Sequence, residues 1–253
     1  MIKDFLRFIR LETCLFISGI ALSGYLLFNQ PDWIMLLLFA TTLFSCATIY
    51  SYNHLKDKKE DKENRSLNPY AVKDRKDIPI LTGLFSFLFA ILLPFHSFLL
   101  FLFLFLFGIF YSATRIKSKF FLIKNLYTAF SLGMVFLIGA SVYQFEEAMF
   151  IYFGIVFLFG WLLNLLGDIR GVEGDRVAGV KSIPVILGYK IGKRIAYLLL
   201  LFLISVCTFF SPFRIFVPFL FAILIFLYFD LHKPARFSLL LSFILFPLTF
   251  LII

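Results

Sequence analysis

The sequence predicts an all-α, polytopic bundle of membrane-spanning helices, and three observations support this fold class. Of the 253 residues, 61% are apolar and 15% are charged, whereas a soluble domain is typically about half apolar and about a quarter charged. The apolar residues form long continuous runs, unlike the alternating pattern of membrane-spanning strands. The charged residues lie in short segments between these runs. The net charge of +9 therefore reflects orientation in a membrane, and we expect no nucleic-acid partner.

Nine of the apolar runs are long enough to serve as spans. A helix needs about 20 apolar residues to cross the hydrocarbon core, with a range of roughly 17–25. By this measure, the predicted spans are residues 10–28, 32–52, 78–94, 97–114, 122–143, 147–167, 194–210, 213–229 and 236–253. Close helix packing most simply explains the glycines inside these spans, which include Gly133, Gly139, Gly160 and Gly167.

The basic residues predict the orientation of the chain. Cytoplasmic segments of membrane proteins carry an excess of Lys and Arg. If the N-terminus is cytoplasmic, every Lys and Arg except Arg214 falls in an inner segment. The outer turns at 29–32, 94–97 and 144–147 are short and neutral or acidic. We therefore expect an integral, multi-pass protein of the cell membrane with a cytoplasmic N-terminus.

Two inner loops, at residues 53–77 and 168–193, are longer and more highly charged than simple connectors. Each follows the second span in a group of four. This arrangement predicts two related four-helix halves and one extra helix, within a single transmembrane domain over residues 1–253.

The first loop carries regularly spaced oxygen ligands. If the second span continues as a helix beyond the membrane, Asn53, Asp57 and Asp61 lie within about 80° of one another on one face. Magnesium is typically bound by one or two protein carboxylates together with water and phosphate oxygens. The interleaved lysines could meet an anionic ligand or lipid headgroups. A solvated, mixed-charge helix is the open alternative for this loop taken alone.

The second loop also carries regularly spaced acidic residues. Asp168 and Asp175 are seven residues apart, which returns to within about 20° on a helix. Asn164 lies one turn before Asp168, and we expect it to face the interior. Like charges at one site repel unless a cation or a basic group offsets them. Two Mg²⁺ ions bridging a diphosphate would satisfy both loops and would act as Lewis acids on the leaving group.

Three segments resemble a known family. The pattern N-x-x-x-D-x-x-x-D at 53–61 and the stretch VEGDRVAGVKSIPVILG at 172–188 are similar to motifs of the UbiA superfamily of intramembrane prenyltransferases. FYSATRIKSK at 110–119 resembles the tyrosine–lysine motif of that family, and Asn125 fits the asparagine that often follows it. The resemblance covers the whole chain in order. It implies a helical bundle whose central cavity opens to lipid and is capped by the two acidic loops.

The resemblance also implies roles for individual residues. Asn53, Asp57 and Asp61 would hold one face of a magnesium–diphosphate complex, and Asp168 and Asp175 would hold the other. Further contacts to the diphosphate are implied for Tyr111, Lys117, Lys119 and Arg65. Ionisation of the carbon–oxygen bond would leave an allylic cation, which an acceptor nucleophile captures. Such a reaction needs concentrated positive charge at the diphosphate and a water-poor chamber around the cation.

The chain departs from the family pattern at two positions. His54 and Gly171 stand where the family often has acidic residues. Neither is assigned as a ligand, and the role of His54 is open; a lone loop histidine is more often solvated than functional.

The predicted function is Mg²⁺-dependent transfer of a prenyl chain from a polyprenyl diphosphate to a lipid-soluble or amphipathic acceptor. Two hints about the acceptor conflict. The first helix and second motif look more like the branch that uses archaeal-type geranylgeranylglyceryl phosphate, whereas the Y-S-A-x-x-x-K spacing looks more like the branch that prenylates tetrapyrroles. An aromatic quinone precursor is a further option. Donor chain length and oligomeric state do not follow from the sequence.

Two other classes of protein are alternatives. A secondary transporter usually places functional charges or broken helices near the midplane of the membrane. Here the middle of each span is nearly free of charge, which disfavours transport. The third class is a non-catalytic membrane scaffold.

Overall fold

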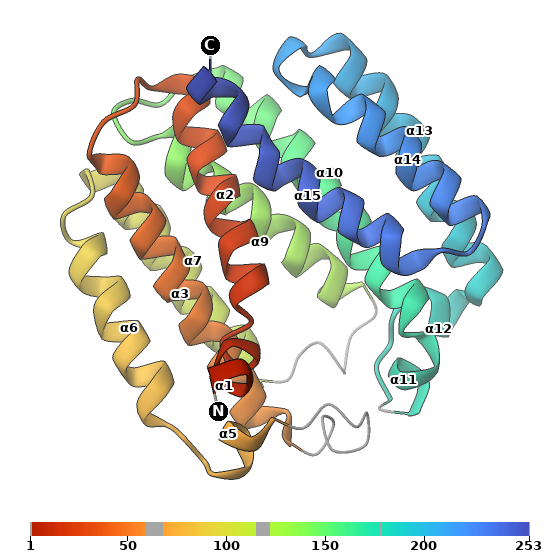
Figure 1. Cartoon of the computed structure of the whole chain (residues 1–253), viewed down its shortest axis with the longest axis horizontal. Coiled ribbons are helices and arrows are strands. Elements are labelled where there is room, and N and C mark those ends of the chain that lie inside the picture. Colours follow the sequence, from red (N-terminus) through yellow and green to blue (C-terminus); the bar gives the residue numbers. More distant parts are fainter. Residues whose placement is uncertain (1, 59–67, 115–121, 178, 253) are drawn as a thin grey trace. The chain divides into compact units, whose positions relative to one another are not determined.

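The computed structural model describes residues 2–58, 68–114, 122–177 and 179–252, and within these ranges it is helical without any strand (Figure 1). The helices, in chain order, are α1 (Ile2–Phe8), α2 (Leu11–Phe28), α3 (Ile34–Lys56), α5 (Pro69–Val72), α6 (Asp77–Ala90), α7 (Phe95–Thr114), α9 (Ile123–Ala140), α10 (Glu147–Arg170), α11 (Val172–Val177), α12 (Ile183–Leu187), α13 (Tyr189–Phe209), the 3₁₀ helix η1 (Ser211–Phe216), α14 (Val217–Tyr228) and α15 (His232–Ile252). The chain divides into two compact units. Unit 1 is Met1–Ile116 with Met134–Glu146, and unit 2 is Lys117–Gly133 with Glu147–Ile253.

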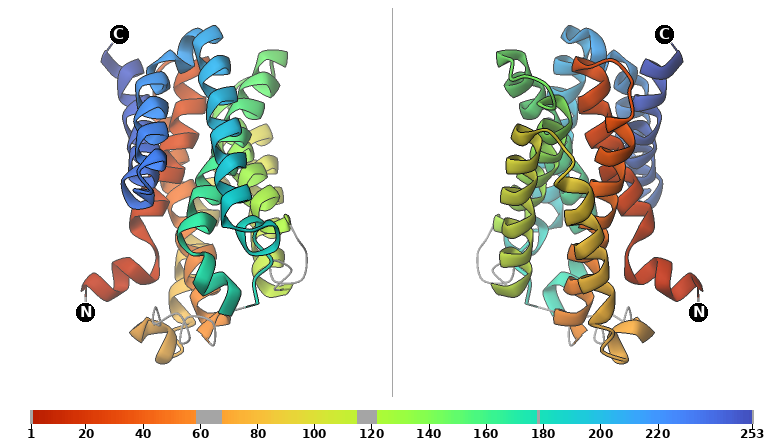
Figure 2. Two further views of the ribbon diagram at one scale, coloured as in Figure 1. Left: turned by 90° about the vertical axis from the view of Figure 1, so that its right-hand side faces the viewer. Right: turned by 90° about the vertical axis from the view of Figure 1, so that its left-hand side faces the viewer.

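In unit 1, α3 is the central helix and contacts α2, α6 and α7. Helices α3, α6 and α7 run side by side (Figure 1; Figure 2, right). Two hydroxyl hydrogen bonds join α3 to α6. The Thr48 Oγ1 lies 2.9 Å from the Thr82 Oγ1, and the Ser86 hydroxyl donates to the Thr41 carbonyl at 3.0 Å. Such interhelical hydrogen bonds satisfy polar groups that lipid cannot.

Helix α2 packs against residues 134–140 of α9 with almost no space between the two backbones. A Cβ atom added to Gly24 would lie 2.2 Å from the Phe136 carbonyl oxygen, and one added to Gly139 would lie 1.9 Å from the Ala21 carbonyl oxygen. Small residues at helix interfaces allow this close approach inside a membrane. The predicted packing role of Gly139 is therefore confirmed.

In unit 2, α10 and α14 contact α13, and α15 contacts α10 and α14 (Figure 2, left). The buried positions of α13 recur every three or four residues, at Ala196, Leu200, Leu203 and Cys207. This period places them on one face of a helix.

The first half of α9 packs on α10 through glycines. A Cβ atom at Gly160 would lie 2.9 Å from the Ala129 Cα, and one at Gly133 would lie 2.6 Å from the Phe153 ring. The predicted packing role of these two glycines is confirmed. The same prediction is wrong for Gly167, where an added Cβ atom would meet no atom of the described residues within 4 Å.

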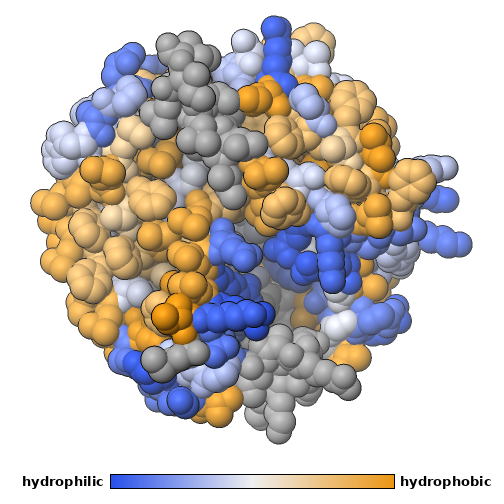
Figure 3. Space-filling model, in the orientation of Figure 1, coloured by the Kyte–Doolittle hydropathy of each residue, from blue (hydrophilic) through white to orange (hydrophobic). Residues whose placement is uncertain are grey.

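Within the described residues, seven helices are long and apolar enough to cross a membrane, and α6 is shorter, with 14 residues. A helix lies in every predicted span, but the count of nine spanning helices stays a prediction. Large apolar side chains on α6 face outward, with Ile80 and Leu88 each 61% exposed. The surface over α6 in Figure 3 is accordingly apolar, as a surface in contact with lipid would be.

The structure corrects the extent of both predicted loops. Helix α3 ends at Lys56, with Asp57 as its C-cap, so the described helix does not continue toward Asp61. The predicted loop at 168–193 is largely helical. It contains the last turn of α10, all of α11 and α12, and the start of α13. Its helices can pack because apolar side chains such as Ile183 are buried.

Candidate functional site

In unit 2, one ammonium group contacts two carboxylates of the candidate site. The Lys124 Nζ donates to the Asp168 Oδ1 at 2.6 Å and to the Asp175 Oδ2 at 3.4 Å. Helical hydrogen bonding continues across the break between α10 and α11, because the Asp175 N–H donates to the Gly171 carbonyl at 2.9 Å. Asp168 and Asp175 therefore point to the same side, as their seven-residue spacing predicts.

This cluster is strongly buried. Asp168 is 1% exposed, and the side chains of Lys124 and Asp175 are 27% and 19% exposed. A buried carboxylate is costly unless an opposite charge and hydrogen bonds compensate it, so Lys124 is what permits Asp168 to be ionised there. The Asp168 Oδ2 has no hydrogen-bond partner among the described residues. Glu173, the other acidic residue of this segment, is instead 76% exposed and pairs with Arg176 at 3.1 Å.

Further buried polar atoms without partners lie on the same face of α10 as Asp168. Within the described residues, the Trp161 Nε1 and the Asn164 Nδ2 are buried and make no hydrogen bond, and the Asn125 amide is buried next to Asp168. Trp161, Asn164 and Asp168 follow an i, i+3, i+7 spacing and share one face of α10. An unsatisfied buried polar group costs about 1–3 kcal/mol. Such a concentration of them is what a site for an oxygen-rich ligand requires, and the interior position expected for Asn164 agrees with it.

In unit 1, Asn53 and Asp57 occupy successive turns at the end of α3. The Asp57 N–H donates to the Asn53 carbonyl at 2.8 Å, so the two side chains lie on one face. Lys58 turns to Asp74, at an Nζ–Oδ1 distance of 2.6 Å. Hydrogen bonds from Lys58 and Lys76 lower the pKa of Asp74 below its ordinary value.

The diphosphate contacts inferred from the resemblance are only partly described. Tyr111 is buried near the end of α7, which lies at the same end of unit 1 as Asn53 (Figure 1). The remaining predicted site residues lie outside the described residues, and these are Asp61, Arg65, Lys117 and Lys119. Asn53 and Asp57 belong to unit 1, whereas Asp168 and Asp175 belong to unit 2. The meeting of the two motifs therefore stays a prediction.

His54 is not the solvated loop residue that the sequence suggested. It lies within α3, is 8% exposed and stacks on Phe8 with ring centroids 5.8 Å apart. The Arg10 Nε donates to the His54 Nε2 at 3.3 Å, and the Arg10 guanidinium lies 5.2 Å from the centre of the Tyr50 ring. Arg10 itself has a left-handed backbone, with φ of 52°, at the break between α1 and α2. His54 and Tyr50 thus fix the direction of an arginine that sequence reasoning had treated only as a topology signal.

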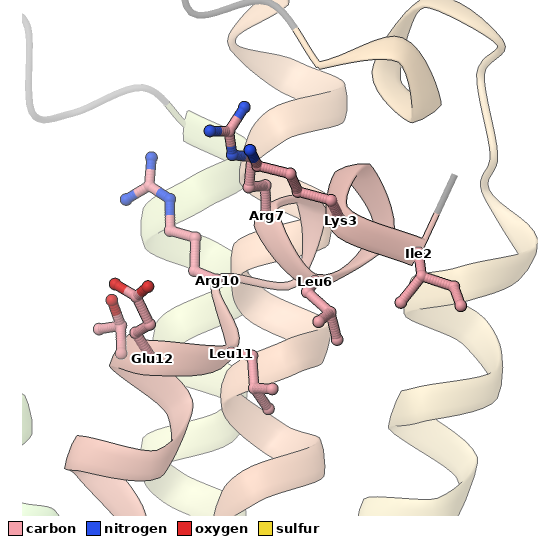
Figure 4. Close-up of a pocket in the computed structure, with 8 residues that line it drawn as sticks. Ile2, Lys3, Leu6, Arg7, Arg10, Leu11 and Glu12 are labelled. Carbon is pink, nitrogen blue, oxygen red and sulfur yellow. The ribbon is translucent and has the colours of Figure 1, made fainter.

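A pocket of about 640 Å³ lies beside this arginine at the start of the chain. Its charged lining consists of Lys3, Arg7, Arg10 and Glu12. In Figure 4 the three basic side chains extend to one side, while Ile2, Leu6 and Leu11 point to the other. A patch with three cations and one carboxylate would attract an anion, and its apolar side suits the edge of a lipid layer.

Within the described ranges, no three His, Cys, Asp or Glu side chains gather as ligands of a metal ion. The unit 1 motif offers a carboxylate and an amide, and the unit 2 motif offers two carboxylates that share Lys124. Sequence reasoning missed Lys124 as a member of the site. In the sequence, Lys124 is the third residue of the predicted span 122–143, at its cytoplasmic end. This position does not indicate which side chains it contacts.

Seven long apolar helices and carboxylates at the ends of α3 and α10 define a polytopic membrane protein with acidic sites at helix ends. The UbiA prenyltransferase family model matches residues 13–238, and the chain belongs to this family.

Similarity to individual proteins agrees with this assignment. The chain is 33% identical over 75 residues to digeranylgeranylglyceryl phosphate synthase of Methanopyrus kandleri. The matched segment covers 30% of this chain and 28% of the relative. It is 32% identical over 117 residues to the synthase of the same name from Methanobrevibacter smithii. This matched segment covers 42% of this chain and 41% of the relative. The matched segments thus span less than half of either relative. The structure of a UbiA homolog from Archaeoglobus fulgidus bound to GPP and Mg²⁺ has the same fold, with a TM-score of 0.77, 17% identity and coverage of 99% and 100%.

Proposed function

We propose that this protein transfers a prenyl chain from a polyprenyl diphosphate to an amphipathic acceptor at the cytoplasmic side of the cell membrane. The observation that carries the proposal is the buried Asp168–Lys124–Asp175 cluster with the unpartnered polar atoms on the same face of α10. Membership of the prenyltransferase family supports it. The position of this cluster at the end of a span, away from the midplane, favours an enzyme over a transporter.

The residues at the end of α3 fit a magnesium ion. Asn53 and Asp57 present oxygen atoms from successive turns, and Asp61 is the third residue of the same sequence motif. Mg²⁺ typically needs only one or two carboxylates when phosphate oxygens and water complete its shell. When bound, the ion would supply Lewis-acid stabilisation of the diphosphate leaving group. The Archaeoglobus fulgidus homolog bound to GPP and Mg²⁺ supports this cofactor.

The chain itself would supply the other requirements of the reaction. Tyr111, Lys117, Lys119 and Arg65 would donate hydrogen bonds to the diphosphate, which leaves with the electron pair of the carbon–oxygen bond. The apolar interior would keep water from the allylic carbon. An acceptor hydroxyl oxygen then bonds to that carbon, and its proton passes to the released diphosphate or to water.

We propose geranylgeranylglyceryl phosphate as the class of acceptor. The basic pocket of Lys3, Arg7 and Arg10 supports an acceptor that carries a phosphate, since the net charge of its lining is complementary to a phosphate dianion. The names of the two curated relatives support the same acceptor class. An uncharged aromatic acceptor would make no use of this pocket.

The test is a transfer assay with purified protein in lipid nanodiscs. Labelled geranylgeranyl diphosphate is combined with geranylgeranylglyceryl phosphate or with an aromatic acceptor, in Mg²⁺ or in chelator. We expect a product with the phosphate acceptor in Mg²⁺ alone. Equal product in chelator would refute the metal assignment, and absence of product with every acceptor would refute prenyl transfer.

A further inference from the structure

The pair Asp168 and Asp175 does not fit a metal ion in the way that the sequence analysis expected. The Lys124 ammonium stands between the two carboxylates, 2.6 Å from the Asp168 Oδ1 and 3.4 Å from the Asp175 Oδ2. Mg²⁺ would have to lie about 2.0–2.1 Å from the same oxygens. Both cations cannot occupy this position, and two cations side by side would repel each other strongly in a buried site.

The pair also has few neighbouring oxygen ligands. On the shared face of α10 and α11, the position between the two carboxylates is Gly171, which has no side chain to offer as a ligand. Glu173 does not restore a third ligand, because it is exposed and paired with Arg176.

The geometry of Lys124 suits contact with a phosphate. An ammonium group has three N–H donors, and the two carboxylates use two of them. The third donor is available for an anionic oxygen. The Lys124 side chain is 27% exposed and so can be reached by a ligand, whereas Asp168 is 1% exposed.

We infer that Lys124 is a built-in cation that replaces a second metal ion, so that the protein uses a single divalent ion for each bound diphosphate. Asp168 and Asp175 hold and orient the ammonium, and the ammonium contacts the diphosphate. This inference rests on the proposed function, because it concerns the binding of the same diphosphate.

The test counts bound ions without requiring turnover. Protein in nanodiscs is dialysed to equilibrium with radioactive Mn²⁺ and labelled geranylgeranyl thiolodiphosphate, an analogue that does not react. We expect one Mn²⁺ per bound analogue for the wild type and for Lys124→Arg, which keeps the charge. Lys124→Met exposes both carboxylates to a new cation, so we expect two Mn²⁺ ions. The matched control, Lys193→Met, removes the ammonium of a separate ion pair with Asp230 and should still give one.

Two Mn²⁺ ions per analogue in the wild type would overturn the inference, whether or not the variants fold. A single ion in folded Lys124→Met would also overturn it. Asp175→Asn gives an independent check. If Lys124 replaces the second metal ion, this variant should still bind one Mn²⁺ per analogue. If a metal ion binds at Asp168 and Asp175, the count should fall from two in the wild type to one in the variant. Failure of the analogue to bind would refute the proposed function and this inference with it. Normal prenyl transfer with two bound ions would refute the inference alone.

Discussion

Replacement of Lys124 by Met should destabilise the protein through a buried charge that loses its partner. Asp168 is 1% exposed and depends on this ammonium, while the side chains of Lys124 and Asp175 are 27% and 19% exposed. Breaking a buried ion pair by removing one partner costs about 3–5 kcal/mol. Because water reaches the lysine and Asp175, we expect a smaller loss, of about 2–4 kcal/mol.

The assay is reversible unfolding in mixed micelles of dodecyl maltoside and SDS, followed by far-UV circular dichroism in the presence of chelator. The second substitution Asp168→Leu should restore most of the stability of Lys124→Met, because it removes the unpaired charge. The Lys193→Met variant serves again as the control and should unfold like the wild type, since Asp230 is well exposed. A loss below about 0.5 kcal/mol for Lys124→Met, or no recovery in the double variant, would refute the reasoning.

Three further predictions test other parts of the protein. Asp57→Ala should lower prenyl transfer by about a hundredfold or more while the unfolding curve stays unchanged, and activity near the wild-type level would remove this residue from the site. Gly139→Ala should destabilise unit 1 by about 1–3 kcal/mol or more in the same unfolding assay, because its Cβ atom would lie 1.9 Å from the Ala21 carbonyl oxygen. Gly154→Ala is the matched control, since its Cβ atom would meet no atom within 4 Å in the part of the chain that the structure describes; equal losses in both variants would contradict the packing argument. Arg7→Glu should raise the KM for a phosphate-bearing acceptor about tenfold with little change in kcat, whereas Arg7→Lys should retain most affinity, and an unchanged KM for Arg7→Glu would remove the pocket from acceptor binding.

The sequence alone determined those features of this protein that depend only on residues close together in the sequence. Continuous apolar runs specified the helices and the membrane environment, because backbone groups in lipid must bond within their own segment. The seven-residue spacing of Asp168 and Asp175 placed both carboxylates on one side, since helical periodicity is a local property. The motifs at 53–61 and 172–188 are also local patterns, and they indicate the family to which the chain belongs.

Only the tertiary structure decided which distant side chains meet. Lys124 is 44 residues from Asp168 in the sequence, and no periodicity relates the two. The burial of His54 against Phe8, and its contact with Arg10, likewise depend on how α1 folds back onto α3. Local patterns restrict the direction of a side chain along its own helix, but partners across helices depend on packing that involves the whole unit. The apolar runs thus specified a membrane bundle, and the packing of α9 on α10 placed an ammonium between the two carboxylates.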